Sequence, residues 1–131
     1  MAAIVVIIED NPTTADITSR LLYAVGFDEI YLTSTAEEGM ALVQRVRPQL
    51  IIVDERLPDA SGTELVRSIR TYDPTLTIAM STVLDDAAVM HAAFEAGCNY
   101  YLVKPGGLRK LCQAYPTPDQ IINPKAHEFF R

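Results

Sequence analysis

The sequence lacks the features that mark membrane-spanning, exported and nucleic-acid-binding proteins. None of its apolar runs approaches the roughly 20 residues needed to cross a bilayer, and Met1-Ala2-Ala3 lacks the basic residues that begin a secretory signal. Its 11 Lys and Arg residues form no cluster and are outnumbered by 17 Asp and Glu residues. Because affinity for nucleic acid comes mainly from clustered cations, we expect neither a nucleic-acid partner nor a membrane contact.

Cysteine is also scarce, since the chain has only Cys98 and Cys112. Their spacing is not that of a metal site, and without an export signal reduced thiols in the cytosol are the default. We therefore assign them no chemistry and expect a cytoplasmic protein. A length of 131 residues, with 49% apolar and 21% charged residues, is typical of one soluble globular domain.

Short apolar runs alternate with longer segments of helical periodicity, which is typical of βαβ units and a parallel sheet. The predicted strands are residues 4–8, 30–33, 50–53, 76–80 and 100–103. The second run is less apolar and indicates an edge strand. With short connections and right-handed crossovers, the pattern predicts an α/β protein with a flavodoxin-like (βα)5 doubly wound parallel sheet and strand order 2-1-3-4-5.

The segments between these strands have the periodicity and the end residues of helices. Pro12 begins the first helix, whose spacing predicts a packed face of Ile17, Leu21 and Val25. The other helices are expected around residues 35–47, 65–73, 86–96 and 108–115.

The end of the sequence has a different pattern, because Pro116 and Pro118 break regular structure. We expect a domain at residues 1–115 and a C-terminal tail without a domain of its own at residues 116–131. Its Phe129-Phe130 pair could dock the tail or contact a partner, but a frayed end is the expected state.

Polar side chains follow four of the predicted strands at their carboxyl ends. In chain order they are Glu9 and Asp10, Asp54, Ser81 and Thr82, and Lys104. Ligands of open parallel sheets bind at this edge, at the point where the strand order reverses, which here lies between the first and third strands. We therefore expect these side chains to share one pocket.

Three carboxylates in one pocket would repel one another unless a cation joined them. Oxygen ligands without His or Cys favour Mg²⁺, and we expect Asp10 and Asp54 to bind it directly. A carboxylate can also attack phosphorus and form an aspartyl phosphate, provided that the charge on the phosphoryl oxygens is neutralised. Lys104 and the Thr82 hydroxyl would serve this purpose together with the metal.

Three motifs carry a resemblance to a known family. They are Ile8-Glu9-Asp10-Asn11-Pro12, then Ile51-Ile52-Val53-Asp54 with Leu57-Pro58 and Gly62, and finally Tyr101-Leu102-Val103-Lys104-Pro105. In this order and at this spacing, the sequence resembles the receiver domain of bacterial two-component response regulators. The likeness covers about residues 2 to 115.

The resemblance implies a role for each polar residue. Asp54 is the expected phosphoacceptor, Glu9 and Asp10 the acidic pair around Mg²⁺, the main-chain carbonyl of Arg56 a further metal ligand, Lys104 the partner of the phosphoryl group, Thr82 the switch hydroxyl, and Tyr101 the aromatic that turns inward with it. Ser81 is the alternative to Thr82 if the loop carries an insertion.

The resemblance also implies partners. The phosphoryl donor would be a phosphohistidine on a sensor histidine kinase or on a histidine phosphotransfer protein. A downstream protein would then bind the face made by the fourth helix, the fifth strand and the fifth helix. The chain would be a switch in a two-component or phosphorelay pathway rather than an enzyme, with slow autodephosphorylation, and we expect a monomer or a weak dimer.

Departures from the family pattern leave alternatives open. Val83 follows the switch hydroxyl where a small residue is usual, Gly106-Gly107 replaces an aromatic and a capping residue, and the last helix ends early at Pro116. These residues motivate a second hypothesis, a phosphorylation-deficient receiver that acts as a constitutive docking module. A third, a phosphatase of the haloacid dehalogenase type, needs a second aspartate two residues after the nucleophile, where this chain has Arg56.

Overall fold

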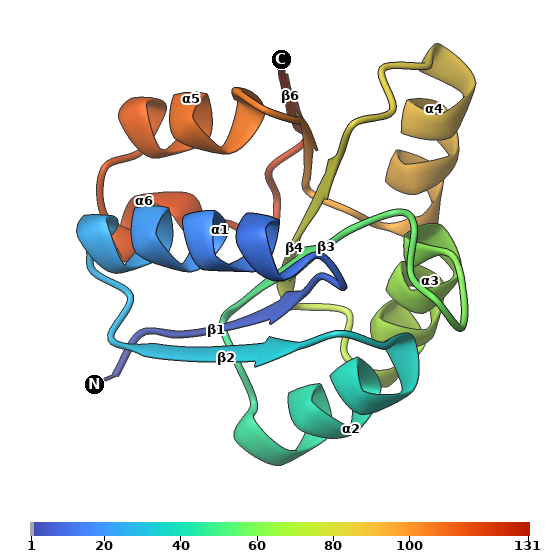
Figure 1. Cartoon of the computed structure of the whole chain (residues 1–131), viewed down its shortest axis with the longest axis horizontal. Helices are drawn as coiled ribbons and strands as arrows, with labels where there is room; N and C mark the ends of the chain where they lie inside the picture. The colour runs from blue at the N-terminus through green and yellow to red at the C-terminus, as the bar shows by residue number, and fades with distance from the viewer. Residues whose placement is uncertain (1) are drawn as a thin grey trace.

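The computed structural model describes residues 2–131, which form a six-stranded parallel sheet with helices on both faces (Figure 1). The strands are β1 (Ile4–Ile8), β2 (Glu29–Thr33), β3 (Leu50–Val53), β4 (Thr77–Thr82), β5 (Tyr100–Val103) and β6 (Glu128–Phe130). The helices are α1 (Pro12–Val25), α2 (Ala36–Val46), α3 (Gly62–Tyr72), α4 (Ala87–Ala96), α5 (Gly107–Ala114) and α6 (Pro118–Ile121). The order β2-β1-β3-β4-β5-β6 confirms the predicted doubly wound sheet and adds one strand to it.

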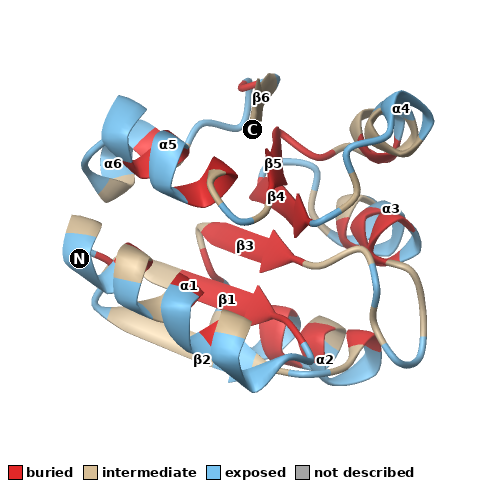
Figure 2. Cartoon of the chain, turned by 45° about the horizontal axis from the view of Figure 1, so that its top comes forward, coloured by how far each residue is buried: buried red, intermediate tan, exposed pale blue. Residues whose placement is uncertain are grey.

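The sheet separates two apolar cores, and this explains the continuous apolar runs of its central strands. Successive side chains of a strand point to opposite faces, so Val6 and Ile8 pack with α2, α3 and α4, whereas Val5 and Ile7 pack with α1, α5 and α6. Figure 2 shows the resulting burial of β1, β3, β4 and β5. β2 is only partly buried, as an edge strand should be.

Capping residues close to the helix ends fix where the helices begin and end. The N-cap side chains that accept a hydrogen bond from the first turn of α1, α2, α3 and α4 are Asn11, Thr35, Ser61 and Asp86. Gly97 ends α4 with a φ of 118°, a conformation that favours glycine.

The predicted packing face of α1 is wrong in one position. Ile17 is 52% exposed, and the buried residues are Ala15, Thr18 and Leu22. These residues have the i, i+3, i+7 spacing of one helix face, and this is the face that packs on the sheet. Leu21 and Val25 pack only at the margin of this core.

The expected frayed tail is also wrong, because residues after Pro116 form α6 and β6 and pack on the sheet. Ile121 is fully buried, and the Tyr100 hydroxyl donates a hydrogen bond to its carbonyl oxygen at 2.8 Å. Phe129 and Phe130 are half-buried in β6. Within residues 2–131, no helix is both long and apolar enough to cross a membrane.

Candidate functional site

Three carboxylates meet at the carboxyl ends of β1 and β3. Ligand oxygens of Glu9, Asp10 and Asp54 lie within 4.8 Å of one another. The backbone holds two of these residues, because Glu9 N–H donates to the Thr33 carbonyl at 2.9 Å and Asp54 N–H donates to the Ile8 carbonyl at 3.0 Å. β1 and β3 are neighbours with β2 on the far side of β1, so the group lies where the strand order reverses.

Lys104 comes to the same group from the end of β5. Its Nζ lies 2.5 Å from Glu9 Oε1 and 3.6 Å from Asp54 Oδ2. Its own backbone N–H donates to the Thr82 carbonyl at 2.8 Å, which joins the ends of β4 and β5. The structure therefore brings together the predicted acids and the predicted lysine.

The charges of the group fit a hard divalent cation. When all three carboxylates are ionised, the single ammonium of Lys104 leaves two negative charges unbalanced. Burial raises the pKa of Glu9 above its ordinary value, against the opposing hydrogen bonds from Lys104 and from the Asn11 N–H. Oxygen donors with excess negative charge are the usual environment of Mg²⁺.

The loop after Asp54 is folded tightly against it. The Gly62 N–H donates to the Glu55 carbonyl at 2.8 Å, and a Cβ at Gly62 would lie 2.3 Å from the Asp54 carbonyl oxygen. Arg56 pairs with Ser61 in an isolated antiparallel bridge that closes the turn. Only glycine allows the loop to approach Asp54 this closely.

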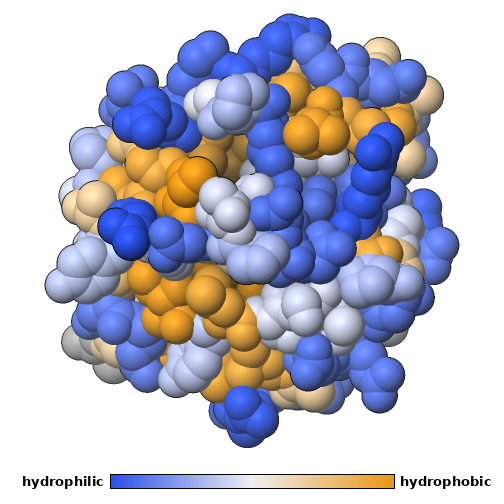
Figure 3. Space-filling view, in the orientation of Figure 1, coloured by the Kyte–Doolittle hydropathy of each residue, from blue (hydrophilic) through white to orange (hydrophobic). Residues whose placement is uncertain are grey.

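The two candidate hydroxyls end β4 and are both buried. As neighbours in a strand they point to opposite faces of the sheet. Ser81 lines a hollow of about 300 Å³ together with Lys104 and Ile17. Figure 3 shows the apolar residues that gather in this region, between α1 and α5. Thr82 lies on the other face, which is also the face of Tyr101.

Thr82 and Tyr101 both contact the backbone of Leu84. Thr82 Oγ1 accepts a hydrogen bond from the Leu84 N–H at 3.4 Å, and the Tyr101 hydroxyl donates to the Leu84 carbonyl at 2.7 Å. Burial raises the pKa of Tyr101 to about 12, so the hydroxyl keeps its proton and remains a donor. The peptide groups of Leu84 thus link the hydroxyl at the end of β4 to the buried aromatic in β5.

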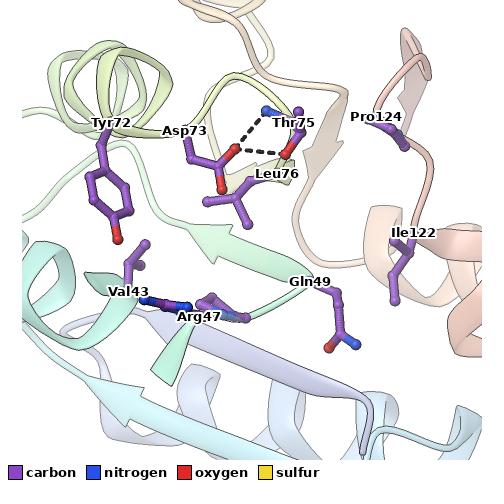
Figure 4. A pocket seen from close by; sticks show the side chains of 10 residues that line it. Val43, Arg47, Gln49, Tyr72, Asp73, Thr75, Leu76, Ile122 and Pro124 are labelled. Carbon is purple, nitrogen blue, oxygen red and sulfur yellow. Dashed lines mark hydrogen bonds between the residues drawn. The ribbon is translucent and has the colours of Figure 1, made fainter. Parts of the chain in front are cut away.

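A larger hollow of about 550 Å³ lies at the opposite end of the sheet (Figure 4). Two of its polar side chains have partners within the chain, since Asp73 accepts two hydrogen bonds from Thr75 and the Gln49 amide contacts the backbone of Ala2 and Ile4. It is far from the carboxyl ends of the strands, and we assign it no chemistry.

Comparison with known proteins identifies the class of molecule. The family model of the response regulator receiver domain matches residues 5–116, and the chain belongs to this family. The transcriptional regulatory protein CitT of Bacillus subtilis is 32% identical over 102 residues, which are 77% of this chain and 45% of that protein. The cell cycle transcriptional regulator CtrA of Caulobacter vibrioides is 32% identical over 104 residues, 77% of this chain and 43% of that protein.

Solved structures agree with this assignment. A putative response regulator from Chloroflexus aurantiacus has a TM-score of 0.82 and 27% identity, with 94% of this chain and 100% of that chain covered. A CheY-like receiver domain protein from Methanospirillum hungatei has a TM-score of 0.79 and 27% identity, with 87% and 90% covered. The chain spans about half the length of the curated relatives it matches, 45% to 52% for the first three.

The family defines what kind of molecule this is. Receiver domains are signalling switches of two-component systems and are generally not enzymes, and they bind Mg²⁺ at an acidic pocket. In this chain, Glu9, Asp10 and Asp54 form a group of acidic residues that could hold a metal ion.

Proposed function

We propose that this chain accepts a phosphoryl group on Asp54 and thereby changes the surface that a downstream protein binds. The donor would be a phosphohistidine on a sensor histidine kinase or on a histidine phosphotransfer protein. The protein would be located in the cytoplasm. One observation carries the proposal: Asp54 lies in a group of three carboxylates within 4.8 Å, with the Lys104 ammonium 3.6 Å from its oxygen.

The transfer needs a carboxylate nucleophile and a means to neutralise phosphoryl charge. A bond forms between an Asp54 oxygen and phosphorus, and the bond between phosphorus and the donor's imidazole nitrogen breaks. The electron pair of that bond stays on the nitrogen, and the ring leaves as neutral imidazole when its other nitrogen carries a proton. Asp54 attacks as a carboxylate and therefore has no proton to lose. Lys104, already beside the carboxylate, would donate to the phosphoryl oxygens as their charge increases.

Mg²⁺ belongs to the proposal because the residues present suit it. Asp10 and Asp54 would hold it directly, with Glu9 and the main-chain carbonyl of Arg56 completing the protein ligands. When bound, the ion would neutralise the excess charge of the carboxylates and of the incoming phosphoryl group.

The switch would pass through Thr82 and Tyr101. Once Asp54 carries a phosphoryl group, its oxygens offer the Thr82 hydroxyl a stronger acceptor than any neutral group. Movement of the Thr82 hydroxyl would displace the Leu84 N–H, which donates a hydrogen bond to it. The carbonyl oxygen of Leu84 accepts the hydrogen bond of the Tyr101 hydroxyl, so that bond would change as well. The change at the site would thus reach β5 and the neighbouring surface of α4.

Beryllium trifluoride with Mg²⁺ tests this proposal, because the complex mimics a phosphoryl group on a carboxylate. We expect it to shift the backbone amide resonances of Thr82, Leu84 and Tyr101 in NMR spectra. The isosteric Asp54→Asn variant is the matched control and should not respond. An equal response of the variant would refute the role of Asp54.

A further inference from the structure

β6 is a part of this chain that the family does not account for. The family match ends at residue 116, whereas β6 begins at Glu128 and pairs in parallel with β5. β6 contacts α5 and lies between α5 and α4 (Figure 2). It therefore covers the edge of β5 on the surface through which we propose that the switch acts.

The surrounding residues are adapted to this strand. A Cβ at Gly107 would lie 2.7 Å from the carbonyl oxygen of Phe130, so a glycine at the start of α5 gives β6 its room. The Tyr115 hydroxyl donates a hydrogen bond to the Glu128 carboxylate. On the other side, the His127 ring stacks on Phe94 of α4 with their centroids 4.1 Å apart.

The β6 segment, residues 128–131, has no buried residue, whereas Ile121 and Ala126 before it are buried. The Asn99 amide donates to the carbonyl oxygens of Pro124 and Ala126, both at 3.1 Å, and Ile121 is fully buried. In contrast, every residue of β6 is only half-buried and the strand has three residues. Local opening favours such weakly packed segments, so β6 can separate while α6 stays in place.

Two contacts join the β6 segment to the loop that follows Thr82. Arg131 Nε donates to Asp85 Oδ2 at 2.8 Å, and Asp85 lies in the loop between β4 and α4. The Phe129 ring lies 6.4 Å from the ring of Tyr101, which bonds to Leu84 in the same loop. The loop therefore contacts the β6 segment directly through Asp85 and Arg131, and indirectly through Tyr101, on which Phe129 packs.

We infer that β6 is an autoinhibitory strand, which covers the partner-binding surface until phosphorylation of Asp54 releases it. The inference rests on the proposed function. Recruitment of Thr82 toward the phosphoryl group draws Leu84 and Asp85 toward the site, which lengthens the Asp85–Arg131 pair and disturbs the packing of Phe129 on Tyr101. The coupling is reciprocal: if phosphorylation favours the release of β6, then release of β6 favours the phosphorylated state by the same factor. Variants that weaken the β6 contacts should therefore favour the phosphorylated state.

Amide hydrogen exchange of the full chain, read by NMR, tests this inference. Addition of Mg²⁺ and beryllium trifluoride should lower the protection of the amides at 128–130, while the amides of α6 keep theirs. The Arg131→Ala variant should lower the beryllium trifluoride concentration at half-saturation about two- to five-fold, the range of an exposed ion pair. The matched control is Arg20→Ala, which breaks the exposed Arg20–Asp16 pair on α1 and should change nothing.

The outcomes separate the inference from the proposed function. If beryllium trifluoride shifts the amides beside Asp54 but β6 keeps its protection, the inference is overturned and the proposed function stands. Phe129→Ala removes the contact with Tyr101 and should tighten binding at least as much as Arg131→Ala; unchanged binding in both variants also overturns it. A chain that does not bind beryllium trifluoride overturns both.

Discussion

At the scale of single residues, Lys104 sets the charge balance of the site. It is the only cation within 4.0 Å of the acidic group among residues 2–131. It therefore competes with a bound metal for the same oxygens, although both would neutralise a phosphoryl group. The two effects of this residue can be separated by substitution.

Lys104→Met is expected to bind Mg²⁺ more tightly and to accept a phosphoryl group more slowly. Removing one positive charge within about 4 Å of the carboxylates is worth about 1 kcal/mol or more, which is at least about five-fold in affinity. Isothermal titration calorimetry measures the affinity. Lys110→Met, an exposed lysine of α5, is the control and should bind as the unaltered chain does. Weaker Mg²⁺ binding by Lys104→Met would contradict this account of the charge balance.

Gly62→Ala should destabilise the fold, because its Cβ would lie 2.3 Å from the carbonyl oxygen of Asp54. Neither atom is at the end of a flexible side chain, so the loop must move, at a cost of about 3 kcal/mol in the free energy of unfolding. Gly106→Ala is the matched control, since its nearest neighbour would be 3.8 Å away and its φ is −101°. Urea denaturation that gives equal stabilities for the two variants would refute the explanation.

At the scale of elements, apolar runs predicted most of the sheet. Leu50–Val53 and Tyr100–Val103 were predicted with the bounds that the structure gives. Their side chains are buried on both faces, so the run of apolar residues is itself the signal. β4 continues past Met80 to Thr82, because its polar last residues are buried with the rest of the strand.

β6 was not predicted, since three residues after several prolines have no periodicity of their own. The strand exists because the edge of β5 offers it hydrogen-bonding partners, and this is a tertiary effect that local sequence does not contain. The Ile17 error on α1 has a similar cause: hydrophobicity marked the large side chain, while close packing on the sheet selected Ala15 and Thr18.

Asn99 should stabilise the segment between α6 and β6, which holds these two elements on the sheet. Its buried amide accepts a hydrogen bond from the Ile78 N–H at 2.9 Å and donates to the carbonyls of Pro124 and Ala126. Asn99→Ala leaves these backbone groups without partners, and we expect a loss of about 3 kcal/mol in the free energy of unfolding by urea. The exposed Asn123→Ala is the control, and a similar small effect of both changes would contradict the role of Asn99.

At the scale of the whole molecule, the topology assembles the site. Glu9, Asp54 and Lys104 are far apart in sequence, yet parallel strands deliver them to one edge. This convergence could be predicted from the order of strands and helices alone. The contacts through Leu84 could not, because a backbone amide and carbonyl in a loop carry no sequence signal.

The stability of the molecule should fall in alkaline solution. Burial raises the pKa of Cys98, Tyr100 and Tyr101 to about 12, above their ordinary values of 9.0 for the thiol and 10.0 for the phenols. The folded chain keeps these protons where the unfolded chain has lost them, so the free energy of unfolding decreases from about pH 9 toward pH 12.

Urea denaturation at neutral pH and at about pH 11 measures this decrease. Cys98→Ala removes one of the groups and should make the decrease smaller. A stability that is the same at both pH values, or that rises in alkali, would contradict the burial of these side chains.

The central claim is that Asp54 is the phosphoacceptor of a magnesium-dependent switch. The most direct test is to incubate the chain with Mg²⁺ and a radiolabelled small phosphodonor, and then to map the label by proteolysis and mass spectrometry. We predict one hydroxylamine-labile phosphoryl group on Asp54, absent when Mg²⁺ is chelated and absent in Asp54→Asn. Label on another residue, or equal labelling of the variant, would contradict the account.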